Sequence, residues 1–176
     1  STLIKILSGN YQPTNGELYL QGHSQQFNRP VDARTHGIEV VYQDLALCDH
    51  LTAAHNVFLG REKKKWLGPL RILDNSFMFS KAGEIFAMLK SETRPRDLVK
   101  QMSGGQRQSV AIARTQQSSP ELVLMDEPTA AISVRQVSEV LGLIKRLQTQ
   151  GVGVLLISHR MPDILTVCDL SLIHIS

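Results

Sequence analysis

The sequence predicts an α/β protein with a buried parallel sheet and a mostly helical middle section. Two apolar runs, residues 122–125 and 152–157, flank a stretch whose apolar residues recur at helical spacing. Strand, helix and strand in this order, with both strands apolar throughout, are typical of a βαβ unit in a buried parallel sheet. Polar side chains follow both strands, namely Asp126, Glu127 and His159. Ligands bind at this carboxyl edge in open α/β sheets.

Length and composition are those of one globular domain. The chain has 176 residues, of which 42% are hydrophobic, and a net charge of +3. This basic excess is too small to indicate nucleic acid, so we expect no nucleic-acid partner. No apolar run approaches the ~18 residues that a membrane-spanning helix needs. The two cysteines, Cys48 and Cys168, cannot form a disulfide framework and suggest a reducing compartment.

The first third of the chain predicts a helix, a turn and two strands. Residues 2–7 form an apolar helical pattern that stops at Ser8 and Gly9. Residues 13–16 are a turn signal, and residues 17–21 alternate as a strand does. Residues 38–42 are apolar and β-branched apart from Glu39, which predicts a buried strand that ends at Gln43.

From residue 51 to residue 100 the pattern indicates helices, broken near Gly68-Pro69 and Arg94-Pro95, and no strands. We interpret the charged run 61–65 as a solvated helix face or loop. Trp66, directly after it, is expected to be a packing residue of the core.

The acidic pair that follows the run 122–125 predicts phosphate chemistry. Asp126 can hold a hydrated Mg²⁺, because magnesium binds carboxylates while it keeps several waters. Glu127 can polarise a water for attack on a phosphate. The alternative is that the pair caps the amino end of a helix.

Ser103, Gly104, Gly105 and Gln106 precede a predicted helix over residues 106–115. A hydroxyl, backbone N–H groups that no side chain shields and a helix amino end together predict an anion site. The alternative is an ordinary serine cap with a flexible glycine pair.

Three further positions carry a signal only in context. Ser1 and Thr2 open a helix, as the last residues of a P-loop GxxxxGK[ST] do, although any serine can cap a helix. Gln43 follows a strand and could be a surface amide. His159 also follows a strand and could be a structural histidine.

The order of these motifs resembles that of the nucleotide-binding subunit of ATP-binding cassette (ABC) transporters. In this resemblance Ser1 ends the Walker A motif and Gln43 lies in the Q-loop. Residues 102–106 form the signature motif, and residues 122–126 form the Walker B motif. Residues 130–133 form the D-loop, and His159 is the switch histidine. The run MSGGQRQSVAIART carries most of the resemblance, which extends from Ser1 to about Asp169.

The resemblance implies a P-loop NTPase fold, with a parallel-sheet core, a helical subdomain at about 51–115 and a small antiparallel β segment. It implies that ATP is bound with Mg²⁺ between two cassettes, in a homodimer or a tandem chain. The metal would be held by Ser1, Gln43 and Asp126, and catalysis would depend on Glu127 and His159. The nucleotide would also be bound by Thr2 and, from the second cassette, by Ser103, Gly104, Gly105 and Gln106.

Three other runs, residues 42–47, 56–62 and 158–163, resemble the monosaccharide importers of the ribose, xylose, galactose and fructose type. This implies ATP hydrolysis that powers sugar import, with permease subunits as partners and, indirectly, a sugar-binding protein. The subunit would lie peripherally on the cytoplasmic face of the membrane. The alternatives are an ABC ATPase of DNA repair, chromosome organisation or translation, and a degenerate structural cassette.

The sequence departs from the family pattern at several positions. The glycines and lysine of Walker A are absent, so we expect a fragment truncated within that motif and inactive by itself. Ser133 stands where the D-loop usually has aspartate, which puts its part in coupling in doubt. Met102 replaces leucine, a change that conserves volume. Residues 170–176 resemble a translated sequencing adapter, so we expect a non-native tail; the alternative is a genuine strand.

Overall fold

The computed structural model describes residues 1–130 and 132–172, and its centre is a parallel sheet. Three strands lie side by side in the order β3 (Ile38–Val41), β6 (Leu122–Asp126) and β7 (Gly153–Ile157). Helix α6 (Val134–Thr149) connects β6 to β7, so the predicted βαβ unit is confirmed. The helix ends before Gly151, whose φ of +80° suits glycine.

Both faces of the central strand β6 are buried, which explains why it is apolar up to Asp126. Along β6, Val123 and Met125 belong to one hydrophobic cluster and Leu124, on the opposite face, belongs to another. All three side chains are fully buried. The sheet is therefore the middle layer between two packed layers.

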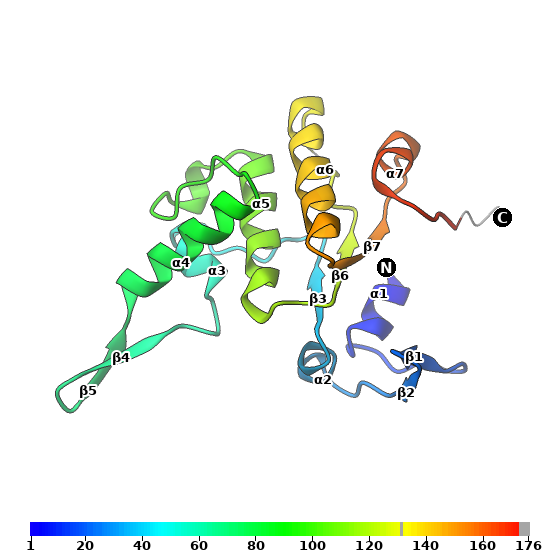
Figure 1. Cartoon of the computed structure of the whole chain (residues 1–176), viewed down its shortest axis with the longest axis horizontal. Coiled ribbons are helices and arrows are strands. Elements are labelled where there is room, and N and C mark those ends of the chain that lie inside the picture. The colour runs from blue at the N-terminus through cyan, green and yellow to red at the C-terminus, as the bar shows by residue number, and fades with distance from the viewer. Residues whose placement is uncertain (131, 173–176) are drawn as a thin grey trace.

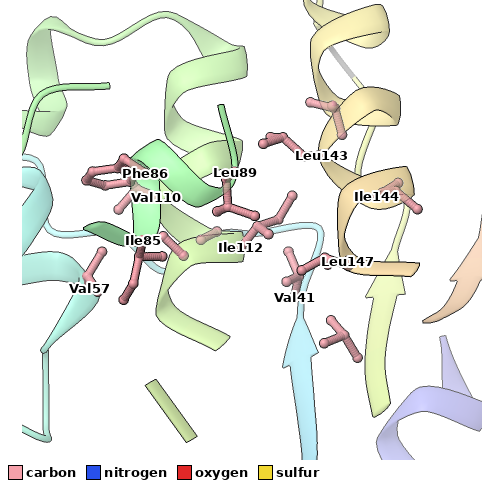
Figure 2. Close-up of a cluster of buried hydrophobic side chains, with 14 of the residues drawn as sticks. Val41, Val57, Ile85, Phe86, Leu89, Val110, Ile112, Leu143, Ile144 and Leu147 are labelled. Carbon is pink, nitrogen blue, oxygen red and sulfur yellow. The ribbon is translucent and has the colours of Figure 1, made fainter. Parts of the chain in front are cut away.

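The first layer contains the helices α3 (Ala53–Val57), α4 (Asn75–Met88), α5 (Gly104–Thr115) and α6. Figure 2 shows apolar side chains of this layer meeting one from β3, Val41. The other labelled residues are Val57, Ile85, Phe86, Leu89, Val110, Ile112, Leu143, Ile144 and Leu147. The helix predicted over 106–115 is thus confirmed, with its amino end at Gly104. The predicted helical subdomain contains α3 to α5, and its boundaries stay a prediction, as does a domain over 1–169.

The second layer is smaller and comes from the start of the chain. Helix α1 (Thr2–Leu7) packs on the sheet through Ile4, and helix α2 (Pro30–Thr35) does so through Ala33. The predicted strand at 17–21 is β1 (Leu18–Leu20), which pairs with β2 (His23–Gln25) as an antiparallel hairpin. The small antiparallel segment that the resemblance implies is therefore present.

The region 51–100 corrects the sequence prediction. It holds a hairpin of β4 (Lys64–Leu67) and β5 (Leu70–Leu73), where we expected no strands. Every residue of both strands is exposed, so no buried face produced an alternation that sequence reading could detect. Trp66 is 69% exposed, and the expectation that it packs in the core is wrong. Gly68-Pro69 forms the turn of this hairpin, between two strands and not between the helices that we expected.

The chain ends with helix α7 (Met161–Val167), which follows β7. Leu170 and Leu172 are exposed and outside any strand, and residues 173–176 of the predicted tail lie outside the described residues. Ala131 of the predicted D-loop does so too. Each helix in the described part of the chain is too short or too polar to cross a membrane.

Candidate functional site

The carboxyl edge of the parallel sheet gathers most of the predicted site residues. The register places Val41 opposite Met125 and Asp126 opposite Ile157. Gln43, Glu127 and His159 each follow a strand by one or two residues, so they lie at the same edge. The prediction that parallel strands bring these distant positions together is confirmed.

Asp126 is the last residue of β6, and its carboxylate meets the amino end of α1. The backbone nitrogen of Ser1 contacts Oδ2 of Asp126, and the two residues are 125 positions apart in sequence. Ser1 also caps α1, because its Oγ accepts a hydrogen bond from the Ile4 N–H at 3.4 Å. A helix amino end, two hydroxyl residues (Ser1 and Thr2) and a carboxylate therefore share one location.

The backbone of Glu127 is held in an unusual conformation. Its φ is +51°, in the left-handed region that non-glycine residues seldom adopt. Its N–H donates to the Ile157 carbonyl at 2.9 Å, which fixes it to the neighbouring strand. Strained residues of this kind cluster at functional sites, where the surroundings enforce the conformation. Glu127 is not the helix cap that the alternative interpretation requires.

The side chain of Glu127 faces His159. Oε2 of Glu127 lies 2.8 Å from Nδ1 of His159, within ion-pair distance. The direction of the approach does not make it a hydrogen bond, and Oε2 has no hydrogen-bond partner in the described part of the chain although it is buried. His159 is 73% exposed and Glu127 only 18%. The mostly buried carboxylate and the accessible imidazole therefore form a pair that a ligand can approach from the side of His159.

A buried network fixes the two loops that carry Glu127 and His159. The Thr129 hydroxyl donates to Oδ2 of Asp163 at 2.6 Å, and both residues are nearly inaccessible. The same carboxylate oxygen lies 3.3 Å from Nε of Arg160. Sequence reasoning missed these three residues, because their contact joins a loop after β6 to a helix 34 positions later.

Gln43 is exposed just past β3, and no described hydrogen bond involves its side chain. The segment after it is tied to the helical layer by Arg114, at the end of α5. The guanidinium of Arg114 donates to the carbonyls of Ala46 at 3.2 Å and Asn56 at 3.1 Å. Burial lowers the pKa of Arg114 from its ordinary value. Sequence reasoning missed Arg114, although it stands within the run that resembles the signature.

Ser103 is the N-cap of α5 and forms a capping box with Gln106. The Ser103 Oγ accepts from the Gln106 N–H at 3.3 Å, and Oε1 of Gln106 accepts from the Ser103 N–H at 3.0 Å. The capping alternative is thus present in the structure. It is compatible with the predicted anion site, because Ser103 is exposed and its hydroxyl donates to no described group.

The glycine pair has a packing role as well. A Cβ on Gly104 would lie 2.7 Å from Cγ2 of Ile132, and one on Gly105 would lie 2.9 Å from Oε2 of Glu139. Both neighbours belong to α6 or the turn before it. The glycines therefore let the amino end of α5 approach α6 more closely than larger residues would, so the pair is held by its neighbours and is not a flexible spacer.

The amino ends of α5 and α6 border a shared cavity of about 410 Å³. Ser103 and Gln106 line it from α5, and Ser133 and Gln136 line it from α6. Ser133 caps α6 with the same kind of capping box. Its Oγ accepts a hydrogen bond from the Gln136 N–H, and Oε1 of Gln136 accepts one from the Ser133 N–H. Serine and aspartate are similarly effective caps, so Ser133 preserves the local structure of the predicted D-loop.

The signature residues and the sheet edge are separate in this copy of the chain. In Figure 1, α5 stands on one side of α6 while α1 and α7 stand on the other. Within the described residues, no hydrogen bond or ion pair joins Ser103 or Gln106 to Glu127 or His159. The structure brings together Ser1, Asp126, Glu127 and His159 and keeps the signature apart from them.

The donor set at the edge fits magnesium. Among the described residues no group of three histidine, cysteine or acidic side chains could hold a metal by itself. Magnesium is commonly held by one or two carboxylates together with substrate phosphates and waters. Asp126 supplies a carboxylate, and Ser1 and Gln43 supply neutral oxygens of the kind that the ion accepts.

Residues 1–130 match the family model described as ABC transporter. The chain is 42% identical to the fructose import ATP-binding protein FrcA of Rhizobium meliloti, over 99% of this chain and 69% of that protein. It is 42% identical to the xylose/arabinose import ATP-binding protein XylG of Sulfolobus acidocaldarius, over 92% of this chain and 63% of that protein. It is 37% identical to the ribose import ATP-binding protein RbsA of Geobacillus kaustophilus, over 96% of this chain but 34% of that protein.

Solved structures share the fold. A dimeric ATP-binding cassette in a post-hydrolysis state, bound to ADP and Pi, superposes with a TM-score of 0.71 and is 27% identical, over 94% of this chain and 72% of that one. The ADP conformation of another ATP-binding cassette superposes with a TM-score of 0.79 at 24% identity, over 96% of this chain and 68% of that one. The predicted ABC ATPase fold is confirmed, and this chain belongs to the ABC transporter family.

Proposed function

We propose that this chain is the ATP-binding and ATP-hydrolysing part of an importer that moves a sugar through a membrane permease. The observation that carries the proposal is the pairing of the mostly buried Glu127 carboxylate with the accessible His159, 2.8 Å apart at the carboxyl edge of the sheet. The names of the relatives, all sugar import ATP-binding proteins, support the direction and class of transport.

In the proposed reaction Glu127 accepts a hydrogen bond from water and polarises it for attack on the terminal phosphate. Its restrained backbone and its strand contact would hold the carboxylate in place, and positioning supplies much of the catalysis in phosphoryl transfer. His159 would contact the terminal phosphate and keep the water in line. The exposure of its ring leaves room for a phosphate next to it.

Nucleotide and metal would be held where α1 meets β6. We assign the phosphates to the amino end of α1, with Ser1 and Thr2, because helix N–H groups and hydroxyls bind anions. Ser1, Asp126 and Gln43 would hold Mg²⁺, which neutralises charge on the phosphates when it is bound. Gln43 would also connect the site to the helical layer, through the segment that Arg114 fixes.

A second cassette would complete the site. Ser103, Gly104, Gly105 and Gln106 lie apart from Glu127 in one copy, so we propose that they bind the ATP of a partner cassette, in a homodimer or a tandem chain. The dimeric assembly of a related cassette supports this arrangement. ATP would then join two cassettes, and hydrolysis would release them, which drives a permease between two states by differential affinity.

The remaining partners follow from the importer class. We propose that permease subunits hold the cassette peripherally at the cytoplasmic face of the membrane, and that a sugar-binding protein acts through the permease. The relatives do not favour an ABC ATPase of DNA repair, chromosome organisation or translation. A degenerate cassette is the outcome that the following experiment would detect.

The test is Glu127→Gln in a chain that carries a complete P-loop ahead of Ser1. Glutamine keeps the size of the side chain but is a poor base, so turnover should fall by about 10²-fold or more while ATP binding is kept. Phosphate release measures turnover, and binding of a fluorescent ATP analogue measures affinity.

Glu84→Gln is the matched control, because Glu84 is 60% exposed on α4 and far from the sheet edge in the fold. It should hydrolyse ATP at the parent rate. A Glu127→Gln variant as active as this control would refute the assigned role. A parent protein that binds ATP without hydrolysing it would indicate a degenerate cassette.

A further inference from the structure

The hairpin of β4 and β5 contains none of the residues of the proposed nucleotide site. It leaves the helical layer between α3 and α4 and projects away from the rest of the chain (Figure 1). Its strands pair with each other, and all eight of their residues are exposed. Nothing within the described chain covers either face.

The tip of the hairpin is apolar. Trp66, Leu67 and Leu70 are 69%, 63% and 64% exposed. The turn between them is Gly68-Pro69, and the φ of Gly68 is +59°. Glycine with positive φ before proline fits a tight type II′ turn, which holds Leu67 and Leu70 opposite each other. Five consecutive residues at the end of the projection therefore offer no charge to water.

The base of the hairpin is basic. Lys63, Lys64, Lys65 and Arg71 surround the apolar tip, and residues 63–73 contain no acidic residue. Lys65 reaches Asp74, outside the hairpin, at 3.5 Å, and it is still half exposed. The Arg71 guanidinium lies 5.6 Å from the centre of the Trp66 ring. The result is an apolar end with a ring of positive charge behind it.

Side-chain direction favours a bilayer over a protein groove. The register places Trp66 with Arg71 on one face, and Leu67 with Leu70 on the other. A groove in a protein covers one face of a hairpin, whereas lipid surrounds a shallowly inserted tip on both sides. Tryptophan and leucine favour the headgroup boundary, and lysine and arginine are attracted to anionic lipid.

We propose that the hairpin 63–73 binds the surface of an anionic lipid bilayer, with Trp66, Leu67 and Leu70 in the headgroup boundary and the basic residues on the phosphates. The contact does not depend on ATP hydrolysis. It would add a direct membrane contact to whatever attachment a permease provides.

The experiment uses the emission of Trp66, the one tryptophan in the sequence. The chain is titrated with vesicles of phosphatidylserine mixed with phosphatidylcholine, and with phosphatidylcholine alone. We expect the emission to shift to shorter wavelength, and the protein to sediment with the vesicles, for the anionic mixture only. The affinity should fall as salt is raised, because salt screens exposed charges.

Two variants of equal net charge separate the hairpin from general electrostatics. Lys63→Glu with Lys64→Glu should weaken binding by about tenfold or more, since each basic residue near the surface contributes attraction. Lys100→Glu with Lys145→Glu changes the net charge by the same amount, at exposed positions outside the hairpin. This variant should bind nearly as well as the parent. Circular dichroism checks that each variant keeps its fold.

A third variant tests the tip, Leu67→Ser with Leu70→Ser, which keeps Trp66 as the reporter and should reduce the shift. Equal binding by both charge variants would overturn the proposal, as would a parent chain whose emission does not respond to anionic vesicles at low salt. Binding only to vesicles that contain a permease would also overturn it and would assign the hairpin to a protein contact. None of these results depends on ATP turnover.

Discussion

The sheet edge around Glu127 and the amino end of α5 around Ser103 are built in different ways. At the sheet edge, Oε2 of Glu127 is buried without a hydrogen-bond partner, and the loop that holds it depends on a contact between Thr129 and Asp163. At the amino end of α5, the side chains of Ser103 and Gln106 each accept a hydrogen bond from the backbone N–H of the other residue. One region is held by tertiary contacts and has a free acceptor, and the other is held locally and is complete as a cap.

The difference has a functional consequence. A carboxylate held by tertiary contacts beside an accessible imidazole suits a pair of groups that meet a ligand together. A helix end that is already capped, with an exposed serine hydroxyl, needs only an anion to approach from outside. The two regions are complementary but separate within one chain, which is why we propose that two copies share each nucleotide.

The largest effect on stability is expected at the buried network of the sheet edge. Asp163→Ala leaves the Thr129 hydroxyl and the Arg160 guanidinium without their acceptor, and should lower the free energy of unfolding by about 2–3 kcal/mol. Urea denaturation measures this. Asp163→Asn keeps an oxygen that can accept from Thr129 and should lose less. If Asp163→Ala were as stable as the parent, the network would not be what fixes these loops.

A smaller effect is expected where α5 meets α6. Gly104→Ala places a Cβ 2.7 Å from Ile132 and should cost about 1–2 kcal/mol, since an overpacked contact must move apart. Gly142→Ala is the matched substitution in the interior of α6, where the new Cβ would be 3.1 Å from the flexible end of Arg146. It should stabilise by up to about 1 kcal/mol through helix propensity. If both substitutions changed the stability in the same direction, the packing role of Gly104 would be contradicted.

The smallest effects are expected at the two capping serines. Ser103→Ala and Ser133→Ala should each cost about 1 kcal/mol, the usual loss for an N-cap. Ser133→Asp should change stability by less than about 0.5 kcal/mol, because aspartate caps as well as serine. Thermal unfolding compares all three. A large gain from Ser133→Asp would show that the aspartate usual in this family contributes beyond capping.

Sequence reasoning predicted those parts of the site that local pattern encodes. The helix after Ser103, the strand that ends at Asp126 and the βαβ unit depend on periodicity and caps within a few residues. The alignment of Gln43, Asp126 and His159 along one edge followed from the parallel sheet. The roles of these residues remain proposals, since geometry alone does not test them.

Other features could not be predicted because their causes are not local. Thr129 meets Asp163, and Arg114 meets the carbonyls of residues 45, 46 and 56, only after the fold has formed. The hairpin at 64–73 could not be predicted for a different reason. It has no buried face, so its residues show no alternation of apolar and polar side chains. Trp66, which the sequence predicts to be a packing residue, lies at the exposed tip of this hairpin.

The central claim is that Glu127 of one copy and Ser103 of another form one nucleotide site. Its most direct test mixes two inactive variants, Glu127→Gln and Ser103→Arg, each in a chain with a complete P-loop. Mixed dimers would carry one intact site, so we predict that ATP hydrolysis returns on mixing, to a fraction of the parent rate. If cross-linking shows that mixed dimers form and no hydrolysis returns, the two regions do not share a nucleotide and the account is wrong.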